Sequence, residues 1–388
     1  MNAFTFYNPV KIYFGKDAIE NVRHELSAFG PNVLLAYGGG SIKRNGLYER
    51  VVTILKECGK NITELSGIMA NPRTTKVEEG VSLVKENHID LILAVGGGSV
   101  IDCSKAIATV SCMEDMTDYW ERLFVKKEKT NRAVPLATIV TLPATGSEMN
   151  TDCVITNWEE QLKYSYSSIH QYPRFSILDP QYTFTMPREQ IVYGSIDILS
   201  HIYEIYFSMP DENNVSDDVA LALMKNVMKN LELALDNPLN ETARGNLMWD
   251  ATMALNGIIQ VGKQEDWMAH KIEHALSAFY DIPHGAGLAI VHPMYLAYVC
   301  KGHYEKFAHY AVSVVGIDPT GKSNRELALE GLKATTAFFK KIGAPTTLRE
   351  VGIPHSAIDV IADKTLCIKT GYGELTKEDV ATILRQCY

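Results

Sequence analysis

Short apolar runs alternate with amphipathic stretches in the first half of the chain. Residues 33–37, 90–95 and 136–141 form mostly apolar runs of about five or six residues, and each ends in a turn of small residues. Stretches with helical periodicity follow two of these runs, at residues 47–58 and 100–110. Short apolar strands separated by helices are typical of a parallel sheet that is buried on both faces. We therefore predict an α/β domain, whose ligands would bind at the carboxyl ends of the strands.

The second half of the chain has long stretches of helical periodicity, and strand-like alternation nearly vanishes after about residue 188. The predicted helices cover residues 191–208, 215–235, 242–259, 269–280, 324–342 and 377–387. A chain of 388 residues also exceeds what one hydrophobic core usually holds. We place the boundary near residues 183–187. This predicts a parallel-sheet dinucleotide-binding domain at residues 1–185 and an all-α C-terminal domain, which binds metal and substrate, at residues 186–388.

Composition narrows the choice of partner and compartment. The net charge of -9 arises from 46 acidic and 37 basic residues, and no basic cluster is longer than residues 126–129, so nucleic acid is not an expected partner. The seven cysteines are scattered without a C-x-x-C pair, as in a protein with reduced thiols. Neither a signal peptide nor an apolar run of membrane-spanning length is visible. We expect a cytoplasmic protein that does not bind membranes.

The three turns of small residues indicate a nucleotide-binding crevice. They contain residues 38–41 (GGGS), 96–99 (GGGS) and 143–147 (PATGS). Glycines let the backbone approach a pyrophosphate closely, and a following helix presents free N–H groups to it. Ser99 is suited to cap that helix, with Asp102 in the acidic place of a capping box. The alternative is a tight strand-to-helix turn without a ligand. Neither triplet fits G-x-G-x-x-G, because Lys43 and Ile101 occupy the place of the third glycine.

The first turn also bears on the choice of nicotinamide cofactor. Enzymes that use NAD place a carboxylate near an early strand end, where it binds the ribose 2′-hydroxyl. Here the turn has no acid, and Lys43 and Arg44 follow it closely. Backbone amides, a hydroxyl and two cations are suited to a 2′-phosphate, which favours NADP(H). The alternative is that the two cations merely begin a solvated helix.

Histidines and one aspartate form the second chemical pattern. Asp197 and His201 are four residues apart in a predicted helix, as are His270 and His274, and His284 follows a break at Pro283. A spacing of four places both side chains on one helical face. A carboxylate and imidazoles from separate helices, with one position left open, are typical of a catalytic metal site. Such an ion would polarise an alcohol oxygen, and a histidine is suited to carry the hydroxyl proton away. Core histidines that bond to backbone carbonyls are the alternative.

With these motifs in hand, the chain resembles the iron-containing (group III) alcohol dehydrogenase family, in particular its NADPH-dependent butanol dehydrogenase and aldehyde reductase branch. The resemblance covers nearly the whole chain. It includes residues 6–15 (FYNPVKIYFG), 96–105 (GGGSVIDCSK) and 143–148 (PATGSE), together with the histidine cluster. It implies a hydride transfer between NADP(H) and a small primary alcohol or aldehyde, and a homodimer.

The resemblance also implies roles for individual residues. It makes Asp197, His201, His270 and His284 the ligands of one divalent metal, either iron or zinc. It makes His274 a proton relay rather than a ligand. The implied cofactor-binding residues are Gly38, Gly39, Gly40, Ser41, Gly97, Gly98, Ser99, Asp102, Thr141, Thr145 and Lys163.

Three other functions fit parts of the pattern. An NAD-linked glycerol dehydrogenase-like enzyme would need an acid at the first turn. A dehydroquinate-synthase-like lyase would need several cations in its pocket, whereas Trp267, Met268, Phe279 and Tyr280 suggest an apolar one. A non-catalytic nucleotide-binding regulator predicts lost metal ligands, and none is missing.

Overall fold

The computed structural model describes all 388 residues and divides them into two compact units. The α/β unit comprises Asn8–Met186 and Pro238–Thr252. The helical unit comprises Met1–Tyr7, Pro187–Asn237 and Met253–Tyr388.

The sequence predicts one boundary, between residues 185 and 186, and two segments of the chain depart from it. The N-terminal segment belongs to the helical unit, where the Asn2 amide donates to Gly262 O at 3.0 Å. Pro238–Thr252 belongs to the α/β unit, where Arg244 donates to Thr183 O at 2.8 Å. Helical periodicity shows that a segment forms a helix, but long-range contacts decide which core that helix joins.

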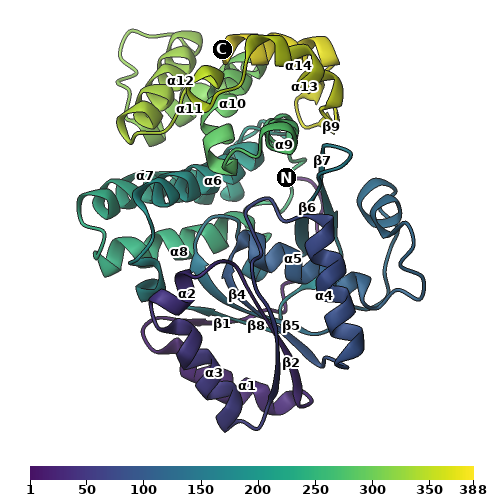
Figure 1. Ribbon diagram of the computed structural model, residues 1–388. Helices are drawn as coiled ribbons and strands as arrows, with labels where there is room; N and C mark the ends of the chain where they lie inside the picture. Colours follow the sequence, from purple (N-terminus) through teal and green to yellow (C-terminus); the bar gives the residue numbers. More distant parts are fainter. The chain divides into compact units, whose positions relative to one another are not determined.

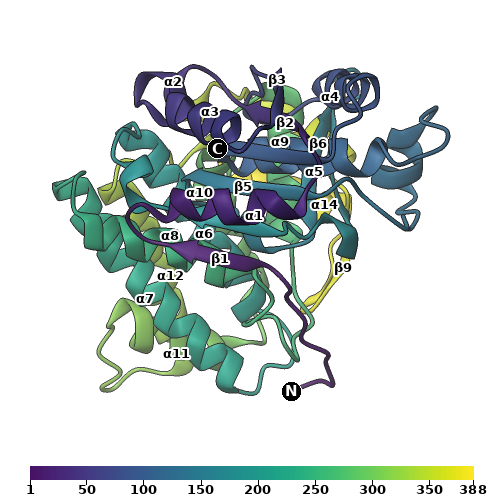
Figure 2. The ribbon, with the colours of Figure 1, turned by 90° about the horizontal axis from the view of Figure 1, so that it is seen from below.

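The α/β unit is built on one parallel sheet of six strands (Figure 1). The strands are β1 (Lys11–Phe14), β2 (Asn32–Tyr37), β3 (Asn61–Leu65), β4 (Leu91–Gly97), β5 (Leu136–Leu142) and β8 (Phe175–Leu178). Their order is β1-β8-β5-β4-β2-β3, and β1 lies along one edge (Figure 2). Every neighbouring pair is parallel. The predicted parallel sheet is thereby confirmed.

The strand order places all three small-residue turns side by side. The runs predicted at residues 33–37, 90–95 and 136–141 are β2, β4 and β5, which are neighbours in the sheet. The chain first adds β3 on one side of β2 and then β4 on the other, so the direction in which strands are added reverses between β2 and β4. Ligands of open parallel sheets bind outside the strand ends at such a reversal. The first and second turns follow the two strands that flank it.

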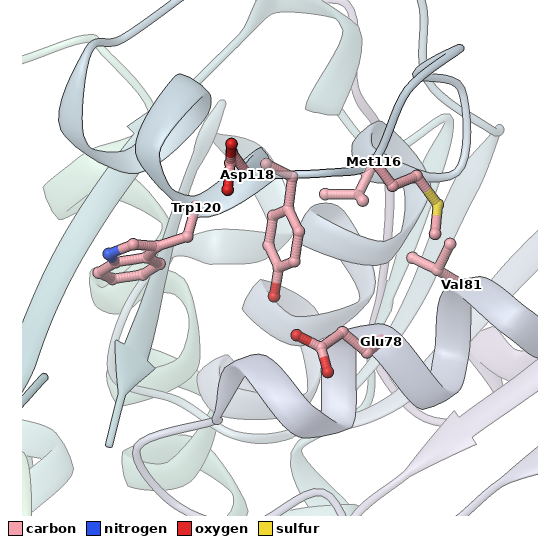
Figure 3. A pocket seen from close by; sticks show the side chains of 7 residues that line it. Glu78, Val81, Met116, Asp118 and Trp120 are labelled. Carbon is pink, nitrogen blue, oxygen red and sulfur yellow. The ribbon is translucent and has the colours of Figure 1, made fainter. Parts of the chain in front are cut away.

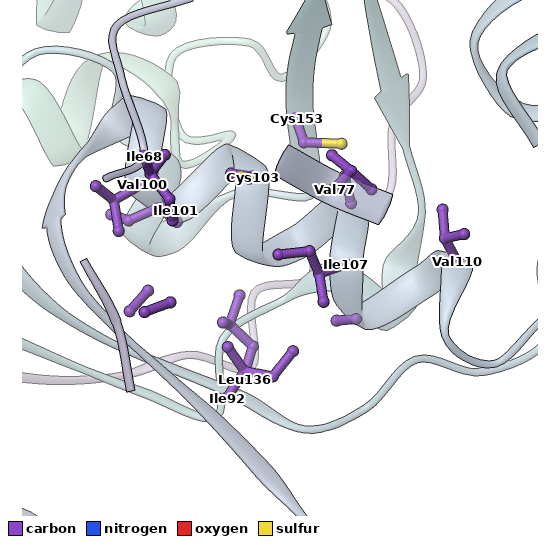
Figure 4. Packing of buried hydrophobic residues seen from close by; sticks show 14 of the residues in the cluster. Ile68, Val77, Ile92, Val100, Ile101, Cys103, Ile107, Val110, Leu136 and Cys153 are labelled. Carbon is purple, nitrogen blue, oxygen red and sulfur yellow. The ribbon is translucent and has the colours of Figure 1, made fainter. Parts of the chain in front are cut away.

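Helices cover both faces of the sheet, and alternate strand residues contact them. Leu34 and Ala36 of β2 belong to the cluster that includes α4 (Thr74–Glu86), α5 (Gly98–Val110) and the π-helical η3 (Trp120–Val125), part of which is shown in Figure 4. The other face of β2 packs with α1 (Val22–Glu25) and α3 (Leu47–Glu57). Burial on both faces explains why the strands are continuously apolar.

The remaining elements of the α/β unit are short. Strands β6 (Asp152–Asn157) and β7 (Leu162–Ser167) form a separate antiparallel hairpin, and β6 contacts α5. Helix α2 (Ser41–Arg44) follows the first turn. Single 3₁₀ turns occupy Ala18–Asn21, Leu26–Ala28, Ser147–Met149, Ile169–Gln171 and Pro180–Thr183. Helix α8 (Glu241–Leu255) lies mostly within this unit.

The second unit consists mainly of helices, as predicted. They are α6 (Arg188–Tyr206), α7 (Val215–Asp236), α9 (Met268–Tyr280), α10 (His284–Val299), α11 (Tyr304–Tyr310), α12 (Asn324–Lys341), α13 (Ile358–Lys364) and α14 (Lys377–Gln386). Shorter elements are η7 (Ala311–Val315), η8 (Leu348–Val351), η9 (His355–Ala357) and the two-residue strands β9 (Lys369–Thr370) and β10 (Gly373–Glu374). Helix α10 contacts both α6 and α9. No helix combines the length and apolar character needed to cross a membrane.

Candidate metal centre and cofactor-binding turns

Three packed helices of the helical unit bring the predicted metal ligands together. Helix α6 carries Asp197 and His201 one turn apart, α9 carries His270, and α10 begins at His284. Pro283 directly precedes that helix, in an extended conformation that fixes where the new helix starts. Four side chains that are up to 87 residues apart in sequence therefore share one place in the fold.

The separations within this cluster fit ligands of a common ion. The Nε2 atoms of His201, His270 and His284 lie 3.5, 3.7 and 3.5 Å from Asp197 Oδ1. These separations are long for hydrogen bonds, and Asp197 Oδ1 and His270 Nε2 are buried without a hydrogen-bond partner. Metal–ligand bonds of about 2.0–2.2 Å in a tetrahedral site put neighbouring ligand atoms about 3.3–3.6 Å apart. The ligand atoms of Asp197, His201 and His270 also lie within 4.8 Å of one another, and His284 joins them through its distance to Asp197. These donor atoms fit a divalent cation beside Asp197.

Two buried glutamates orient the imidazoles. Glu204 Oε2 lies 2.8 Å from His270 Nδ1, and its Oε1 accepts from the His270 amide at 3.1 Å. Glu273 bonds to Nδ1 of His284 in the same way. A carboxylate at Nδ1 holds the proton there and leaves Nε2 free to bind a metal. Sequence reasoning missed both glutamates, although each follows a predicted ligand histidine by three residues in an apolar helix.

Burial and neighbouring charges set the protonation of the cluster. Burial lowers the pKa of His201 to about 4, so its imidazole is neutral. Burial also acts to lower the pKa of His270, but Glu204 and Asp197 outweigh it and raise that pKa to about 9. Burial acts to raise the pKa of Asp197, and the surrounding imidazoles hold it well below its usual value instead. The aspartate is therefore ionised, which metal binding requires.

His274 lies beside the predicted ligands. It is buried on α9, one turn beyond His270, and its ring centre is 5.6 Å from that of His284 and 6.3 Å from that of His270. One nitrogen each of His274 and His284 and one oxygen of Glu273 lie within 4.8 Å of one another. This position is compatible with a proton relay or with a ligand, so the role of His274 stays a prediction.

The predicted cofactor turns lie next to one another at the carboxyl ends of β2, β4 and β5. A Cβ atom on Gly98 would lie 2.3 Å from the Thr145 side chain, and one on Gly38 would lie 3.6 Å from Val100. Gly98 of the second turn thus packs against the third turn, and Val100, just after the second turn, packs against the first. Gly39 differs from these glycines, because a Cβ there would have no neighbour within 4 Å. The turns predicted to hold the cofactor are adjacent, while their binding role stays a prediction.

Helix α5 starts differently from the prediction. It begins at Gly98 with Gly97 as the N-cap residue, so the capping box of Ser99 and Asp102 is wrong. Asp102 instead accepts from Ser147 Oγ at 2.7 Å and from the Val154 amide at 2.9 Å. Both oxygens of this buried carboxylate therefore hold the third turn and the hairpin against α5.

Lys105 of α5 adds a second anchor that sequence reasoning missed. Its Nζ atom is fully buried and donates to Asn150 O, Asn150 Oδ1 and Asp152 O at 2.8–2.9 Å. Lys163, one of the implied cofactor-binding residues, lies on β7 and donates to Asn71 Oδ1 at 2.9 Å. Thr141 is half-buried near the end of β5.

A cavity of about 270 Å3 in the α/β unit is separate from these residues (Figure 3). Glu78 and Val81 of α4, Val110 of α5 and the segment with Met116, Asp118, Tyr119 and Trp120 line it. None of the predicted site residues is among them. The cavity therefore gives no support to the predicted chemistry.

Comparisons with known proteins cover both units of the chain. Residues 9–180 match the family described as iron-containing alcohol dehydrogenase, and residues 191–388 match the C-terminal part of the Fe-containing alcohol dehydrogenase family. A probable NADH-dependent butanol dehydrogenase 2 of Bacillus subtilis (strain 168) is 45% identical, with 99% of each chain covered. The NADPH-dependent aldehyde reductase YqhD of Escherichia coli (strain K12) is 36% identical, with 94% of this chain and 93% of the relative covered.

A solved structure shows the same fold over the whole chain. The NADH-dependent butanol dehydrogenase A of Thermotoga maritima superposes with a TM-score of 0.95 at 40% identity, and the match covers 100% of this chain and 99% of that one. Likeness at this level confirms the fold class of both units.

Proposed function

The chain belongs to the iron-containing alcohol dehydrogenase family, and on that premise we propose that it is a metal-dependent enzyme that transfers a hydride between NADP(H) and a small primary alcohol or aldehyde of the butanol type. The proposal assigns the cofactor to the α/β unit and the metal and substrate to the helical unit. One observation carries it most directly. Three imidazole nitrogens surround one carboxylate oxygen at 3.5–3.7 Å, and the carboxylate is buried and ionised.

Each residue of the helical site has a defined task in this reaction. A divalent cation held by Asp197, His201, His270 and His284 would polarise the substrate oxygen. Glu204 and Glu273 keep the imidazoles in the orientation that presents Nε2. His274 carries the hydroxyl proton outward. Three imidazoles and a carboxylate oxygen suit iron and zinc alike, so the proposal names one divalent ion of either kind.

The preference for NADP(H) rests on the first turn. Ser41 is exposed, Lys43 and Arg44 follow on α2, and no carboxylate stands within the turn. Glu64 on the neighbouring strand β3 accepts from the hydroxyls of Tyr37 and Tyr48, both at 2.6 Å. A carboxylate that is held by two hydroxyls is poorly placed to bind a ribose. The names of the relatives point both to NADH and to NADPH, so they do not decide between the cofactors.

One assay tests the proposal as a whole. Metal content is measured first, and oxidation of NADPH and NADH is then followed with short and medium aldehydes. We expect the wild type to turn over aldehydes with NADPH. In His270→Ala and His284→Ala, both turnover and metal content should fall by orders of magnitude, while the fold survives. Full activity after exhaustive chelation, with no metal found by elemental analysis, would contradict metal dependence.

A homodimer and a cytoplasmic location complete the proposal. Strand β1 has an open edge, and Phe14 at its end is 48% exposed and packs edge-on against Trp249, which is 39% exposed. Exposed strand edges and apolar side chains are suited to pairing with a second copy. All seven cysteines are unpaired, as expected in a reducing compartment. Mass determination in solution tests the dimer, and a value equal to one chain would exclude it.

A further inference from the structure

The residue just before α9 has an unusual backbone. Trp267 has φ 71° and ψ 3°, in the left-handed region, and it is the N-cap residue of α9. Bulky side chains rarely adopt this conformation, which persists only where the surroundings impose it. Just before the tryptophan the chain is pinned by two backbone bonds, from the Gln264 amide to Met209 O at 2.7 Å and from the Asp266 amide to Glu204 O at 2.9 Å. Just after it, the His270 amide donates to Glu204 Oε1 at 3.1 Å. The fold therefore holds Trp267 in a strained position.

The indole ring is held in place as firmly as its backbone. Its Nε1 donates to Glu265 Oε2 at 2.5 Å, and the other oxygen of Glu265 accepts from Gln260 at 3.1 Å. Nε1 is the only polar atom of the indole. With that atom bonded to Glu265, the rest of the half-buried ring presents only apolar surface.

This ring lies against two of the metal-ligand histidines. Its centre is 5.3 Å from that of His270, in an edge-on arrangement, and 5.9 Å from that of His201. Among the aromatic and apolar residues of this segment, Met268 is fully buried in the core. Phe279 and Tyr280 lie at the other end of α9, about 18 Å or more further along the helix axis at 1.5 Å per residue. Of the apolar side chains in this segment, Trp267 is thus the one that lies beside His201 and His270.

We propose that Trp267 forms the apolar wall of the substrate site and selects aliphatic alcohols and aldehydes whose chain carries no second hydroxyl. This inference rests on the proposed function. Once the substrate oxygen is held at the metal centre, the carbons next to it meet the indole. Methylene groups gain from leaving water there, whereas a hydroxyl at the second or third carbon would lose its water without finding a partner. The strain at Trp267 fixes the position of this wall.

A first experiment measures placement without any activity. The chain has four tryptophans, and the other three lie in the α/β unit. One equivalent of Cu²⁺, which quenches indoles at close range, is added to the metal-free protein, and the fluorescence is compared with that of Trp267→Phe. We expect the variant to bind the same amount of metal and to lose most of the metal-induced quenching. Equal quenching in both proteins would show that Trp267 is not beside the metal.

A second experiment measures selection. For linear aldehydes, kcat/KM should rise by up to about fourfold for each methylene that contacts the wall, and glyceraldehyde should be a poor substrate. Trp267→Ala and Trp267→Gly should both flatten this rise and keep their metal. Glycine tolerates a φ of 71°, so it removes the ring without strain and guards against misfolding of the alanine variant. An unchanged dependence on chain length in the folded glycine variant would overturn the inference.

The two proposals can fail separately. If the metal-loaded protein reduces no aldehyde with either cofactor, the proposed function fails, and loss of quenching in Trp267→Phe would still place the indole at the metal. If aldehydes are reduced but Trp267→Gly shows the wild-type chain-length dependence, the inference about the wall fails and the proposed function stands.

Discussion

His274 shares a helical face with His270, and its ring centre is only 5.6 Å from that of His284. If His274 is a proton relay, its loss should slow turnover without weakening metal binding. We expect His274→Ala to keep its metal, to lower kcat strongly and to change the pH–rate profile. Elemental analysis and steady-state kinetics across pH measure this. Metal loss in step with His270→Ala would instead make His274 a ligand.

Gly39 offers a direct test of cofactor choice, because the space around it is open and its φ is not in the left-handed region. Gly39→Asp should therefore fold normally and place a carboxylate near the expected 2′-phosphate. Repulsion of about a few kcal/mol should lower the NADPH/NADH ratio of kcat/KM by about tenfold to a hundredfold. Gly39→Asn is the matched uncharged control. A ratio that is unchanged in the aspartate variant would show that this turn does not read the 2′ position.

Much of the candidate site could be predicted from the spacing of its residues along the sequence. Asp197 and His201, four residues apart, could be placed on one face of a helix from the sequence alone. Glu204 could not be assigned a task, because its partner His270 is 66 residues away on another helix. Asp102 was placed in a capping box by its spacing, whereas burial gives it partners on the third turn and the hairpin. Local patterns therefore identify which groups act, and tertiary contacts decide with which partner.

At the scale of elements, Glu204 couples α6 to the start of α9. We expect Glu204→Gln to bind the metal about 10- to 100-fold more weakly, because the amide orients the His270 ring less well and removes a charge. Competition with a chromophoric chelator measures the affinity. Glu232→Gln, on the exposed face of α7, is the control and should bind metal normally. Equal affinity in both variants would show that Glu204 has no part in metal binding.

Asp102 couples α5 to the third turn and gives the α/β unit a pH-dependent stability. Burial, the largest influence, raises its pKa to about 6 from its ordinary value of 3.8. Between these two values the folded state holds more protons than the unfolded state, so this group makes stability fall as pH rises from about 4 to about 6. The total is about 3 kcal/mol. Urea unfolding at several pH values, compared with Asp102→Asn, isolates this contribution.

Asp102→Asn keeps the side-chain shape but has no titrating group. As the pH falls from about 6 to about 4, the unfolding free energy of the wild type should therefore rise relative to that of the variant. A constant difference from pH 4 to pH 7 would contradict the raised pKa.

Elements were easier to predict where local pattern and tertiary environment agree. The strands β2, β4 and β5 are buried on both faces, and their continuous apolar runs report this directly. The hairpin of β6 and β7 was missed, since its turn lacks the Asn-Gly or Asp-Gly signal and contains Gln161 at φ 55° instead. Helix α8 was found as a helix but assigned to the wrong unit, because the bond from Thr252 to Glu148 spans 104 residues. Such pairings leave no local mark in the sequence.

At the scale of the whole molecule, metal should stabilise one unit selectively. All four predicted ligands belong to the helical unit, and without an ion Asp197 Oδ1 and His270 Nε2 are buried polar atoms that lack a hydrogen-bond partner. An ion at about 1,000 times its Kd adds about 4 kcal/mol to the folded state. Exhaustive chelation should therefore lower Tm and increase hydrogen exchange in α6, α9 and α10, while β2, β4 and β5 keep their protection. In His270→Ala, which has already lost its metal, chelation should change nothing. Loss of protection that is equal in the sheet and the three helices would mean that the ion stabilises the molecule by some route other than this site.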